Sequence, residues 1–475
     1  MPLIKSISGI RGTIGGQPGD NLTPVEIVNF TMAYASFLNL RSKGLKTKVV
    51  IGRDGRVSGE MVRSLVVGAL LSRGANVVDL GIAATPTVEL AVVSQGAQGG
   101  IILTASHNPA GWNALKLLNE QGEYLSKEEG EEIVSLSEES TVDFASESQL
   151  GDYVFNSSLG EEHYQKIIAL PLVDPEAIRQ KKFKIVVDGI NTVGGRAVPE
   201  LLERLGVAPE DLILLNCGID GRFAHKPEPL AENLTEIMER VRETKADLGI
   251  VVDPDVDRLA FIDENGAMIG EEYTLVAIAD YVLANFDALD VLAPGQYKKA
   301  TVSNLSSSRA LKDVTEKHGG TYEAAAVGEV NVVAKMRTTQ AVIGGEGNGG
   351  VIFPALHLGR DALVGIALFL THLAKSGQKV SQLRQALPSY FMVKDRIELT
   401  PDINLPEILD KIKVEYRAEK ITDIDGVKID WPDSWVHLRG SNTEPIMRIY
   451  AEAKDGALAL ARVREIKEKI LSYIR

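Results

Sequence analysis

The stretch KVVIGRDGRVSGEMVRSLVVGALLSRGANVVDLG, residues 48–81, has the pattern that decides the fold. A β-rich run at 48–54 is followed by apolar residues at helical spacing over 59–74, which end on a glycine, and by a second β-rich run at 76–81. A strand, a helix and a strand in this order predict a βαβ unit, in which both strands belong to one mostly parallel sheet.

The same alternation continues outside this stretch. A helix at 85–96 and a strand at 99–106 extend the first unit, a second round opens with KFKIVVDG (182–189), and a third opens with KATVSNL (299–305). From about residue 390, strand-like runs surround one central helix, and a charged helix ends the chain. We therefore expect three similar α/β domains with mixed sheets and a smaller C-terminal α+β domain, arranged around a central cleft.

The composition excludes several classes of function. The chain has 475 residues and a formal net charge of −14, which argues against binding to nucleic acid or to an anionic membrane. No apolar segment of a secretory signal follows Met1, and the longest apolar stretch, ALVGIALFL from Ala362, suits a buried helix. Cys217 is the single cysteine, so no disulfide or thiolate metal site is available within the chain. We expect a cytoplasmic protein.

The strongest local signal is VVDPDVDR, residues 251–258. Asp253, Asp255 and Asp257 follow a β-rich apolar run, and like charges about 4 Å apart repel by roughly 4 kcal/mol per pair at intermediate dielectric. A cation relieves this repulsion, and ligation by oxygen alone favours Mg²⁺, Mn²⁺ or Ca²⁺ over zinc. The alternative is a solvated acidic loop.

An EF-hand does not fit this stretch. Counted from Asp253, Glu264 falls on position 12 of such a loop, but Arg258 stands at position 6, where the sharp turn requires glycine. The flanking segments also have the pattern of strands rather than helices.

A second polar stretch, TASHNP, begins at Thr104. Ser106 at a strand end is a candidate nucleophile or phosphoryl carrier, with His107 beside it and Lys116 ten residues further on. The alternative is that Ser106 caps a helix and His107 belongs to a turn.

Two further stretches offer ligands for a sugar phosphate. In GGEGNGG (344–350), Glu346 and Asn348 are candidate partners for sugar hydroxyls, although a glycine-rich hairpin is an equal interpretation. The stretch RGSNTEP (439–445) offers a cradle for a phosphate, with a polar turn as the alternative; its candidate ligands are Arg439, Ser441, Asn442, Thr443 and the nearby Arg448.

The four polar stretches together favour one chemistry. Each follows a strand, where open α/β sheets bind their ligands. Phosphoryl transfer on a sugar phosphate needs a serine that can carry phosphate, a metal site, side chains that bind sugar hydroxyls and a binding site for the other phosphate. The four stretches offer these parts.

With these motifs in order, the chain closely resembles the α-D-phosphohexomutase superfamily, which contains phosphoglucosamine mutases, phosphomannomutases and phosphoglucomutases. The resemblance covers essentially the whole chain, and it includes SGIRG (8–12), GRDGRVSG (52–59) and ATPTVE (84–89) in the first domain. It implies a phosphoserine domain at 1–153, a metal-binding domain at 154–264, a sugar-binding domain at 265–388 and a phosphate-binding domain at 389–475.

The resemblance also implies roles for individual residues. Ser106 is expected to carry the phosphoryl group, and one Mg²⁺ per chain is expected on Asp253, Asp255, Asp257 and an oxygen of the phosphorylated serine. The groups expected around the transferring phosphate are Arg11, His107, Lys116 and Arg258. The groups expected on the substrate are Glu346 and Asn348 for the sugar, and Arg439, Ser441, Asn442, Thr443 and Arg448 for its other phosphate.

Two departures from the family pattern bear on the substrate. Many bacterial members have Glu-x-Ser-Gly-His in the sugar loop, where this chain has Asn348 and Gly350 in place of the serine and the histidine. Relatives often carry a basic residue where Val330 stands. Both differences resemble an archaeal-type branch that acts on glucosamine or mannose phosphates.

The expected reaction interconverts a hexose 6-phosphate and a hexose 1-phosphate through a 1,6-bisphosphate, with glucose or hexose 1,6-bisphosphate as activator. Glucosamine phosphate is the first choice of substrate, and mannose and glucose phosphates are the alternatives. Either Lys116 or His107 is the base, and a phosphatase and a non-catalytic sugar-phosphate sensor are rival functions. The only partner expected is a small sugar phosphate, and the sequence leaves the oligomeric state open.

Overall fold

The computed structural model of the chain describes residues 3–6, 9–42, 44–138, 143–291, 293–400, 403–441 and 445–474. The chain forms two compact units, Met1–Thr274 with Gly349–Leu383 and Leu275–Asn348 with Arg384–Arg475. None of the helices in the described ranges is both long enough and apolar enough to span a bilayer. Two units do not decide four domain boundaries, so the boundaries named above stay predictions.

The first unit opens with a seven-stranded mixed sheet in the order β1-β2-β6-β5-β3-β4-β7. Its strands are β1 (Ile4–Ser6), β2 (Gly9–Thr13), β3 (Lys48–Arg53), β4 (Asn76–Ile82), β5 (Gly99–Leu103), β6 (Trp112–Leu118) and β7 (Tyr153–Phe155). Its helices are α1 (Pro24–Arg41), α2 (Gly59–Ser72), α3 (Thr85–Ser94) and α4 (Lys127–Ser137). A 3-10 helix spans Glu147–Gln149.

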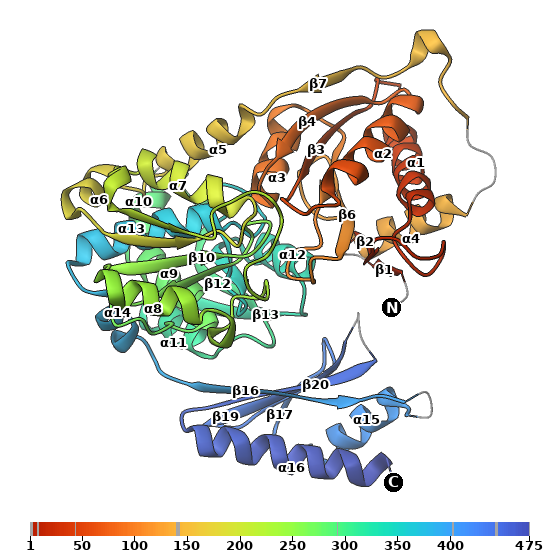
Figure 1. Cartoon of the computed structure of the whole chain (residues 1–475). Coiled ribbons are helices and arrows are strands. Elements are labelled where there is room, and N and C mark those ends of the chain that lie inside the picture. Colours follow the sequence, from red (N-terminus) through yellow and green to blue (C-terminus); the bar gives the residue numbers. More distant parts are fainter. Residues whose placement is uncertain are drawn as a thin grey trace. The chain divides into compact units, whose positions relative to one another are not determined.

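Alternation along the strands places helices on both faces of this sheet. Val49 and Ile51 of β3 pack into a core that includes residues of α1 and α2, whereas Val50 between them packs into a second core with residues of α3. Figure 1 shows α1 and α2 on one side of β3 and β4, and α3 on the other. Successive side chains of a strand point to opposite faces, and because both faces are covered, β3 is apolar on both.

The rest of the first unit has a smaller mixed sheet in the order β11-β10-β8-β9. Its strands are β8 (Ile185–Asp188), β9 (Leu212–Leu215), β10 (Leu248–Val252) and β11 (Leu259–Ile262). The helices are α5 (Leu159–Ile168), α6 (Pro175–Lys181), α7 (Gly194–Arg204), α8 (Thr235–Thr244) and α13 (Ala362–Ser376), with 3-10 helices at Pro209–Asp211 and Ala231–Asn233. The short strand β15 (Gly350–Ile352) also belongs to this unit.

The second unit contains two sheets. The parallel strands β13 (Thr321–Ala325), β12 (Lys298–Asn304) and β14 (Ala341–Glu346) are neighbours in that order, accompanied by α10 (Phe286–Asp290), α11 (Ala310–Lys317) and α12 (Glu329–Thr339). Two helices, α9 (Glu271–Ala284) and α14 (Val380–Ala386), start in the first unit and end in the second.

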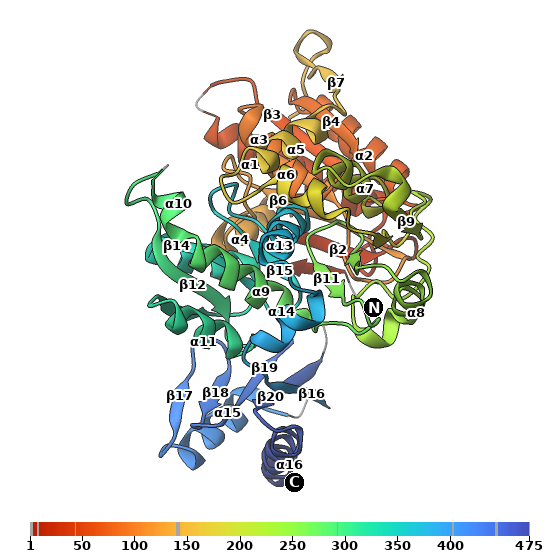
Figure 2. The same ribbon diagram turned by 90° about the vertical axis from the view of Figure 1, so that its left-hand side faces the viewer.

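The C-terminal sheet is antiparallel, in the order β16-β20-β19-β18-β17. Its strands are β16 (Phe391–Glu398), β17 (Lys420–Thr422), β18 (Val427–Asp430), β19 (Ser434–Gly440) and β20 (Ile446–Ala453). The helices α15 (Leu405–Glu415) and α16 (Gly456–Ile474) pack on it and share one apolar core with it. Figure 2 shows α16 close to end-on, beside this sheet.

These elements confirm the expected fold class of three α/β domains with mixed sheets and a smaller α+β domain. The structure differs from the prediction at β5 and β6. The strand expected over 99–106 ends at Leu103, and Ser106 has a left-handed φ of 46°, which no strand accommodates. The strand β6 was not predicted.

Candidate active site

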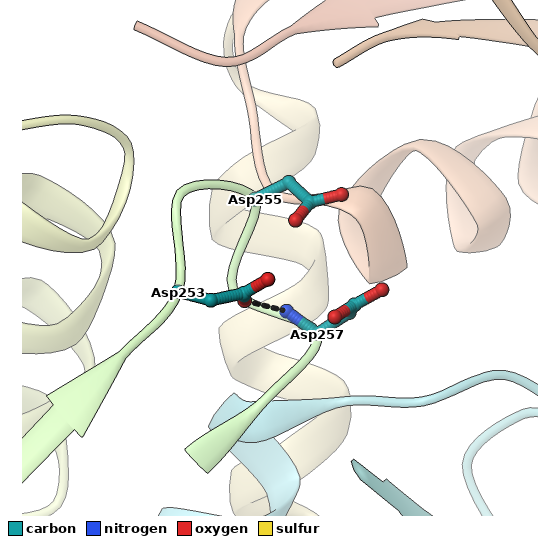
Figure 3. Close-up of side chains that lie close together, drawn as sticks. All are labelled: Asp253, Asp255 and Asp257. Atoms are coloured by element: carbon teal, nitrogen blue, oxygen red, sulfur yellow. Dashed lines mark hydrogen bonds between the residues drawn. The ribbon is translucent and has the colours of Figure 1, made fainter. Parts of the chain in front are cut away.

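Three buried aspartates lie in the loop that joins β10 to β11. Asp253, Asp255 and Asp257 are all fully buried, and one carboxylate oxygen from each lies within 4.8 Å of the others (Figure 3). Val256 between them has a φ of 62°, which is rare for a β-branched residue and turns the chain so that the neighbouring aspartates face the same side. A loop this short therefore gathers three negative charges at one point.

Backbone hydrogen bonds close this loop. Asp253 Oδ1 accepts the N–H groups of Asp257 and Arg258, both at 3.1 Å, and the first of these bonds is drawn in Figure 3. The N–H of Val256 donates to the carbonyl of Asp253 at 3.1 Å. The position of the Asp253 carboxylate is thus set by the loop itself.

The other two carboxylates each use one oxygen for the protein and keep one for another group. Asp255 Oδ2 accepts from Thr85 Oγ1 at 2.9 Å and from Lys116 Nζ at 2.7 Å, and Asp257 Oδ2 accepts from Arg360 Nη2 at 2.7 Å. Asp255 Oδ1 and Asp257 Oδ1 are buried without a hydrogen-bond partner among the described residues. Buried carboxylate oxygens require a partner, and a hard divalent cation that prefers oxygen ligands fits both atoms.

The charges of this loop depend on their surroundings. Burial, together with the charges of Asp257 and Asp255, raises the pKa of Asp253 well above its ordinary value. Burial also acts to raise the pKa of Asp255, but the ammonium group of Lys116 and the hydrogen bonds from Lys116, Asp253 and Thr85 together hold this pKa below the ordinary value. More positive charge at this point would favour the ionised form of Asp253, which is a second reason to expect a metal ion here.

Ser106 meets these aspartates. Its side chain is almost fully buried, and its Oγ donates a hydrogen bond of 2.8 Å to Asp253 Oδ2. The two residues are 147 positions apart in the sequence, so this contact exists only in the folded chain. It places the hydroxyl oxygen directly beside the site proposed for the cation.

Positively charged side chains surround the serine. Arg258 Nη2 donates to His107 Nδ1 at 3.0 Å, and the charge of Arg258, together with burial, lowers the pKa of His107 well below its ordinary value, so this imidazole is neutral. Burial opposes the charge of Lys116, but Asp255 and Asp257 raise its pKa, so this side chain is an ammonium ion.

Arg11 lies on β2, beside the strand that carries Lys116. Its neighbour in the register is Ala114 of β6, and its charge acts on both Asp255 and His107. This part of the first unit therefore combines buried carboxylates, a hydroxyl, a neutral imidazole and several fixed cations, as phosphoryl transfer requires.

The predicted sugar loop lies in the second unit. Glu346, at the end of β14, is 5% exposed, and its Oε1 accepts from Asn304 Nδ2 at 2.7 Å and from the N–H of Gly328 at 3.1 Å. The next N–H, that of Gly347, donates to Ser307 Oγ at 2.9 Å, and Asn348 follows it. These bonds orient the Glu346 carboxylate.

The predicted phosphate cradle also lies in the second unit. Arg439 on β19 is opposite Arg448 on β20, which places two guanidinium groups on adjacent strands. Arg439 Nε lies 3.2 Å from Asp425 Oδ2, and the N–H of Ser441 donates to the carbonyl of Ile446 at 2.9 Å. Asn442 and Thr443, which were also predicted here, lie outside the described residues.

The structure thus brings one group of predicted residues together in the first unit: Arg11, Ser106, His107, Lys116, Asp253, Asp255, Asp257 and Arg258. Sequence analysis found no signal for Arg360, which comes from a segment distant from Asp257. Thr85 lies in the motif ATPTVE, but no pattern marked its contact with Asp255, 170 positions away. Arg56 was within reach of sequence analysis, since it stands just after β3 in the motif GRDGRVSG.

Comparison with known proteins agrees with this architecture. Models of the phosphoglucomutase/phosphomannomutase family match the chain in order: alpha/beta/alpha domain I at residues 3–142, domain II at 161–266, domain III at 271–391 and the C-terminal domain at 396–469. A solved structure, a phosphoglucomutase/phosphomannomutase family protein from Burkholderia thailandensis, superposes with a TM-score of 0.82 at 25% identity, covering 99% of this chain and 97% of that one.

Two curated relatives are similar along nearly their whole length. The phosphoglucomutase/phosphomannomutase of Thermococcus kodakarensis is 36% identical, over 93% of this chain and 94% of that protein. The phosphoglucosamine/phosphogalactosamine mutase of Sulfurisphaera tokodaii is 34% identical, over 98% of this chain and 99% of that protein. This chain therefore belongs to the phosphoglucomutase/phosphomannomutase family, within the α-D-phosphohexomutase superfamily, and is a phosphohexomutase of the isomerase class.

Proposed function

We propose that this phosphohexomutase interconverts the 6-phosphate and the 1-phosphate of a hexose by way of a phosphoryl group carried on Ser106. The observation that carries the proposal is the 2.8 Å hydrogen bond from Ser106 Oγ to Asp253 Oδ2, in a site where Arg258 bonds to His107 and Lys116 bonds to Asp255. A serine in this position can pass a phosphoryl group to a bound sugar and take another back.

In the first transfer, a hydroxyl oxygen of the hexose monophosphate attacks the phosphorus atom carried by Ser106. The new bond joins phosphorus to the sugar oxygen and the bond from phosphorus to Ser106 Oγ breaks. The proton of the sugar hydroxyl passes to a base, and Ser106 Oγ takes up a proton to become a hydroxyl. The product is a hexose 1,6-bisphosphate. Its other phosphoryl group then returns to Ser106 Oγ, so one enzyme cycle regenerates the phosphorylated serine and consumes no phosphate.

His107 is the better candidate for the base. Its lowered pKa keeps the imidazole neutral and able to accept a proton, whereas Lys116 is held as an ammonium ion by Asp255 and Asp257. Lys116, Arg258 and Arg11 instead offset the negative charge that develops on the phosphoryl oxygens.

Asp253, Asp255 and Asp257 would hold one Mg²⁺ per chain, together with an oxygen of the group on Ser106. When bound, the ion supplies positive charge against the oxygens of the transferring group. Glucose 1,6-bisphosphate, or the bisphosphate of the preferred hexose, would load Ser106 and so act as the activator.

The second unit would recognise the substrate. Arg439, Ser441 and Arg448, with Asn442 and Thr443, would bind the phosphate that does not react, because a phosphate is the one group that both orientations of the bisphosphate present at this end. Glu346 and Asn348 would bind the sugar.

Among hexoses we favour glucosamine phosphate, with mannose and glucose phosphates as alternatives. The buried carboxylate of Glu346 can pair with an ammonium group at the sugar's 2-position, and the Sulfurisphaera tokodaii relative is named for amino sugars. The Thermococcus kodakarensis relative is named for glucose and mannose phosphates, so kcat/KM must be compared across the 6-phosphates of all three sugars. Replacing Glu346 with glutamine should reduce a preference for glucosamine phosphate by about tenfold, since a charged hydrogen bond is lost.

The variant Ser106→Ala tests the reaction itself. We expect it to lose mutase activity by a factor of about 10⁴ or more, and to take up no phosphate from labelled hexose 1,6-bisphosphate. The control Ser64→Ala removes a serine on the exposed side of α2, where Oγ only donates to the carbonyl of Glu60, and should behave like the native enzyme. Native turnover in Ser106→Ala would refute the proposal, and steady release of inorganic phosphate by the native enzyme would favour a phosphatase instead.

A further inference from the structure

Arg56 is a buried arginine with every donor engaged. Its side chain is completely inaccessible to solvent, and Nε donates to Asp54 Oδ2 at 2.9 Å. Its other donors reach carbonyl oxygens of the loop after β5 (residues 104–111) and of the first residue of β6: Nη2 those of Ser106 at 2.5 Å and Asn108 at 2.8 Å, and Nη1 those of Pro109 at 2.7 Å and Trp112 at 3.0 Å. One guanidinium group therefore holds the loop that contains Ser106 at three points and the start of β6 at a fourth.

Asp54 binds the beginning of the same loop through a hydrogen bond. Its Oδ2 accepts from Thr104 Oγ1 at 2.7 Å, and Thr104 Oγ1 in turn accepts the N–H of Ser106 at 2.9 Å. The ion pair of Asp54 and Arg56 thus controls both the N–H and the carbonyl of Ser106.

The residue between them, Gly55, is linked by hydrogen bonds to the aspartate loop (residues 253–258). Its N–H donates to Thr192 Oγ1 at 2.8 Å, and the hydroxyl of Thr192 donates to the carbonyl of Pro254 at 3.0 Å. Thr192 is fully buried, so water does not replace these bonds. Pro254 lies between Asp253 and Asp255.

We propose that the turn Asp54–Arg56 acts as a bracket, a turn that holds the serine loop (residues 104–111) at a fixed separation from the aspartate loop (residues 253–258). Arg56 is then a positioning residue for phosphoryl transfer. The proposal rests on the proposed function, because it assigns Arg56 a role through Ser106. The turn grips one loop through Arg56 and the other through Gly55 and Thr192, and so sets the separation of Ser106 from the aspartates.

Backbone strain at both loops explains why such a bracket is needed. Ser106 has a φ of 46° and Val256 a φ of 62°, and left-handed conformations at residues other than glycine persist only where the surroundings enforce them. Without the hydrogen bonds of Arg56, the serine loop can relax toward ordinary backbone angles. Ser106 Oγ then moves away from Asp253, and a misplacement of about 1 Å is enough to slow a transfer on the order of 100-fold.

The test measures single-turnover transfer of phosphate from hexose 1,6-bisphosphate to Ser106 in the full chain. We expect Arg56→Met to slow this transfer on the order of 100-fold, and Arg56→Lys to recover part of the rate, since an ammonium group keeps the ion pair but has fewer donors. KM for the hexose phosphate and the affinity for Mn²⁺ should stay within about threefold of the native values, because neither ligand contacts Arg56.

A matched control separates positioning from general stability. Arg73 is a partly buried arginine of the same domain whose Nη2 donates to Ser36 Oγ at 2.9 Å, away from both loops. Arg73→Met should lower the thermal midpoint and leave the transfer rate unchanged. If Arg56→Met does not fold, the variant Thr192→Val tests the other arm of the bracket, and we expect on the order of tenfold slower transfer because the link from Gly55 to Pro254 is lost.

Two outcomes overturn the bracket. One is native transfer rates in both Arg56→Lys and Thr192→Val, and the other is a rate that follows the thermal midpoint equally in the Arg56 and Arg73 variants. Failure of the proposed function has a different signature, since Ser106→Ala would then be active while the Arg56 variants carried no information about transfer to a serine.

Discussion

Two regions of the molecule differ in how their charges are balanced within the chain. One is the region around Ser106 in the first unit, and the other is the region around Arg439 in the second unit. Around Ser106, Asp255 Oδ1 and Asp257 Oδ1 are buried without hydrogen-bond partners in the described part of the chain, so both oxygens are available to the cation proposed above. Arg439, by contrast, already faces Asp425 at 3.2 Å, although its Nε makes no hydrogen bond in the described residues.

The difference indicates a division of labour. The groups proposed to act on the reacting phosphate are held by hydrogen bonds within the chain, which would lower the reorganisation needed during transfer. The arginine predicted to hold the other phosphate is paired with a carboxylate that a phosphate can replace, which suits a group that must bind and release two orientations of one intermediate.

The largest effect on activity should come from a substitution in the region around Ser106. Asp255→Asn removes one carboxylate and leaves the buried ammonium group of Lys116 without its closest partner. We expect mutase activity to fall by about 10³ or more, and titration with Mn²⁺ to show at least about 100-fold weaker binding. Treatment of the native enzyme with EDTA should abolish activity, and added Mg²⁺ should restore it.

Glu264→Gln is the control for this variant, because Glu264 lies just beyond β11 and bonds to Ser381 instead of to the aspartate loop. Its metal affinity should be native. Unchanged Mn²⁺ binding in Asp255→Asn would show that the aspartates are not the metal site.

A smaller effect is expected in the second region. Arg439→Met should raise KM for the hexose phosphate by about tenfold or more, because a guanidinium contact to phosphate is lost. Asp425→Asn should lower the same KM by about two- to fivefold, since Arg439 then no longer has to exchange a carboxylate for a phosphate. Steady-state kinetics at constant ionic strength distinguish the two, and a raised KM in Asp425→Asn would contradict the idea of an exchangeable pair.

The smallest effect concerns a buried cluster that anchors the segment before α13. Asp361 caps α13 and accepts from His163 and His357, and the second ring nitrogen of His357 lies 3.3 Å from Glu89 Oε2. Burial opposes protonation of His357, but these carboxylates raise its pKa to about 10. The resulting stabilisation is complete below the unfolded pKa of about 6.5 and is lost as the pH rises through 10.

We therefore expect the free energy of unfolding to fall between pH 7 and pH 10 by more than about 1 kcal/mol in the native protein relative to His357→Gln. Urea denaturation at several pH values measures this difference. Parallel pH profiles for the two proteins would show that His357 does not anchor the segment that carries Arg360.

Sequence analysis predicted helices and strands correctly where the hydrophobic pattern within a short segment identifies them. Residues 48–81 predicted β3, α2 and β4 to within a few residues, because a strand and a helix have different periods. It missed β6 as a strand, since all seven residues of β6 are buried, Lys116 among them, and the alternation that marks a half-exposed strand is absent.

The candidate site was predictable to the same degree. Three aspartates between two apolar runs favoured a cation over a solvated loop, and the composition of TASHNP and RGSNTEP was compatible with phosphate. The contribution of Arg360 was not predictable, because it acts on Asp257, 103 positions away, and no quoted motif marks its neighbourhood. Thr85 and Arg56 stand in the motifs ATPTVE and GRDGRVSG, but their contacts with Asp255 and Ser106 join segments that are distant in the sequence.

The amino-acid sequence by itself determined the family and most of the order of strands and helices, and it supplied the residues proposed to bind phosphate, since these follow from short-range periodicity and motif composition. Only the tertiary structure decided that Ser106 meets Asp253, that Arg56 holds the serine loop, and that Arg439 is paired with Asp425. The physical reason is that buried polar groups must find partners wherever the fold brings them, and chain packing rather than sequence distance selects those partners.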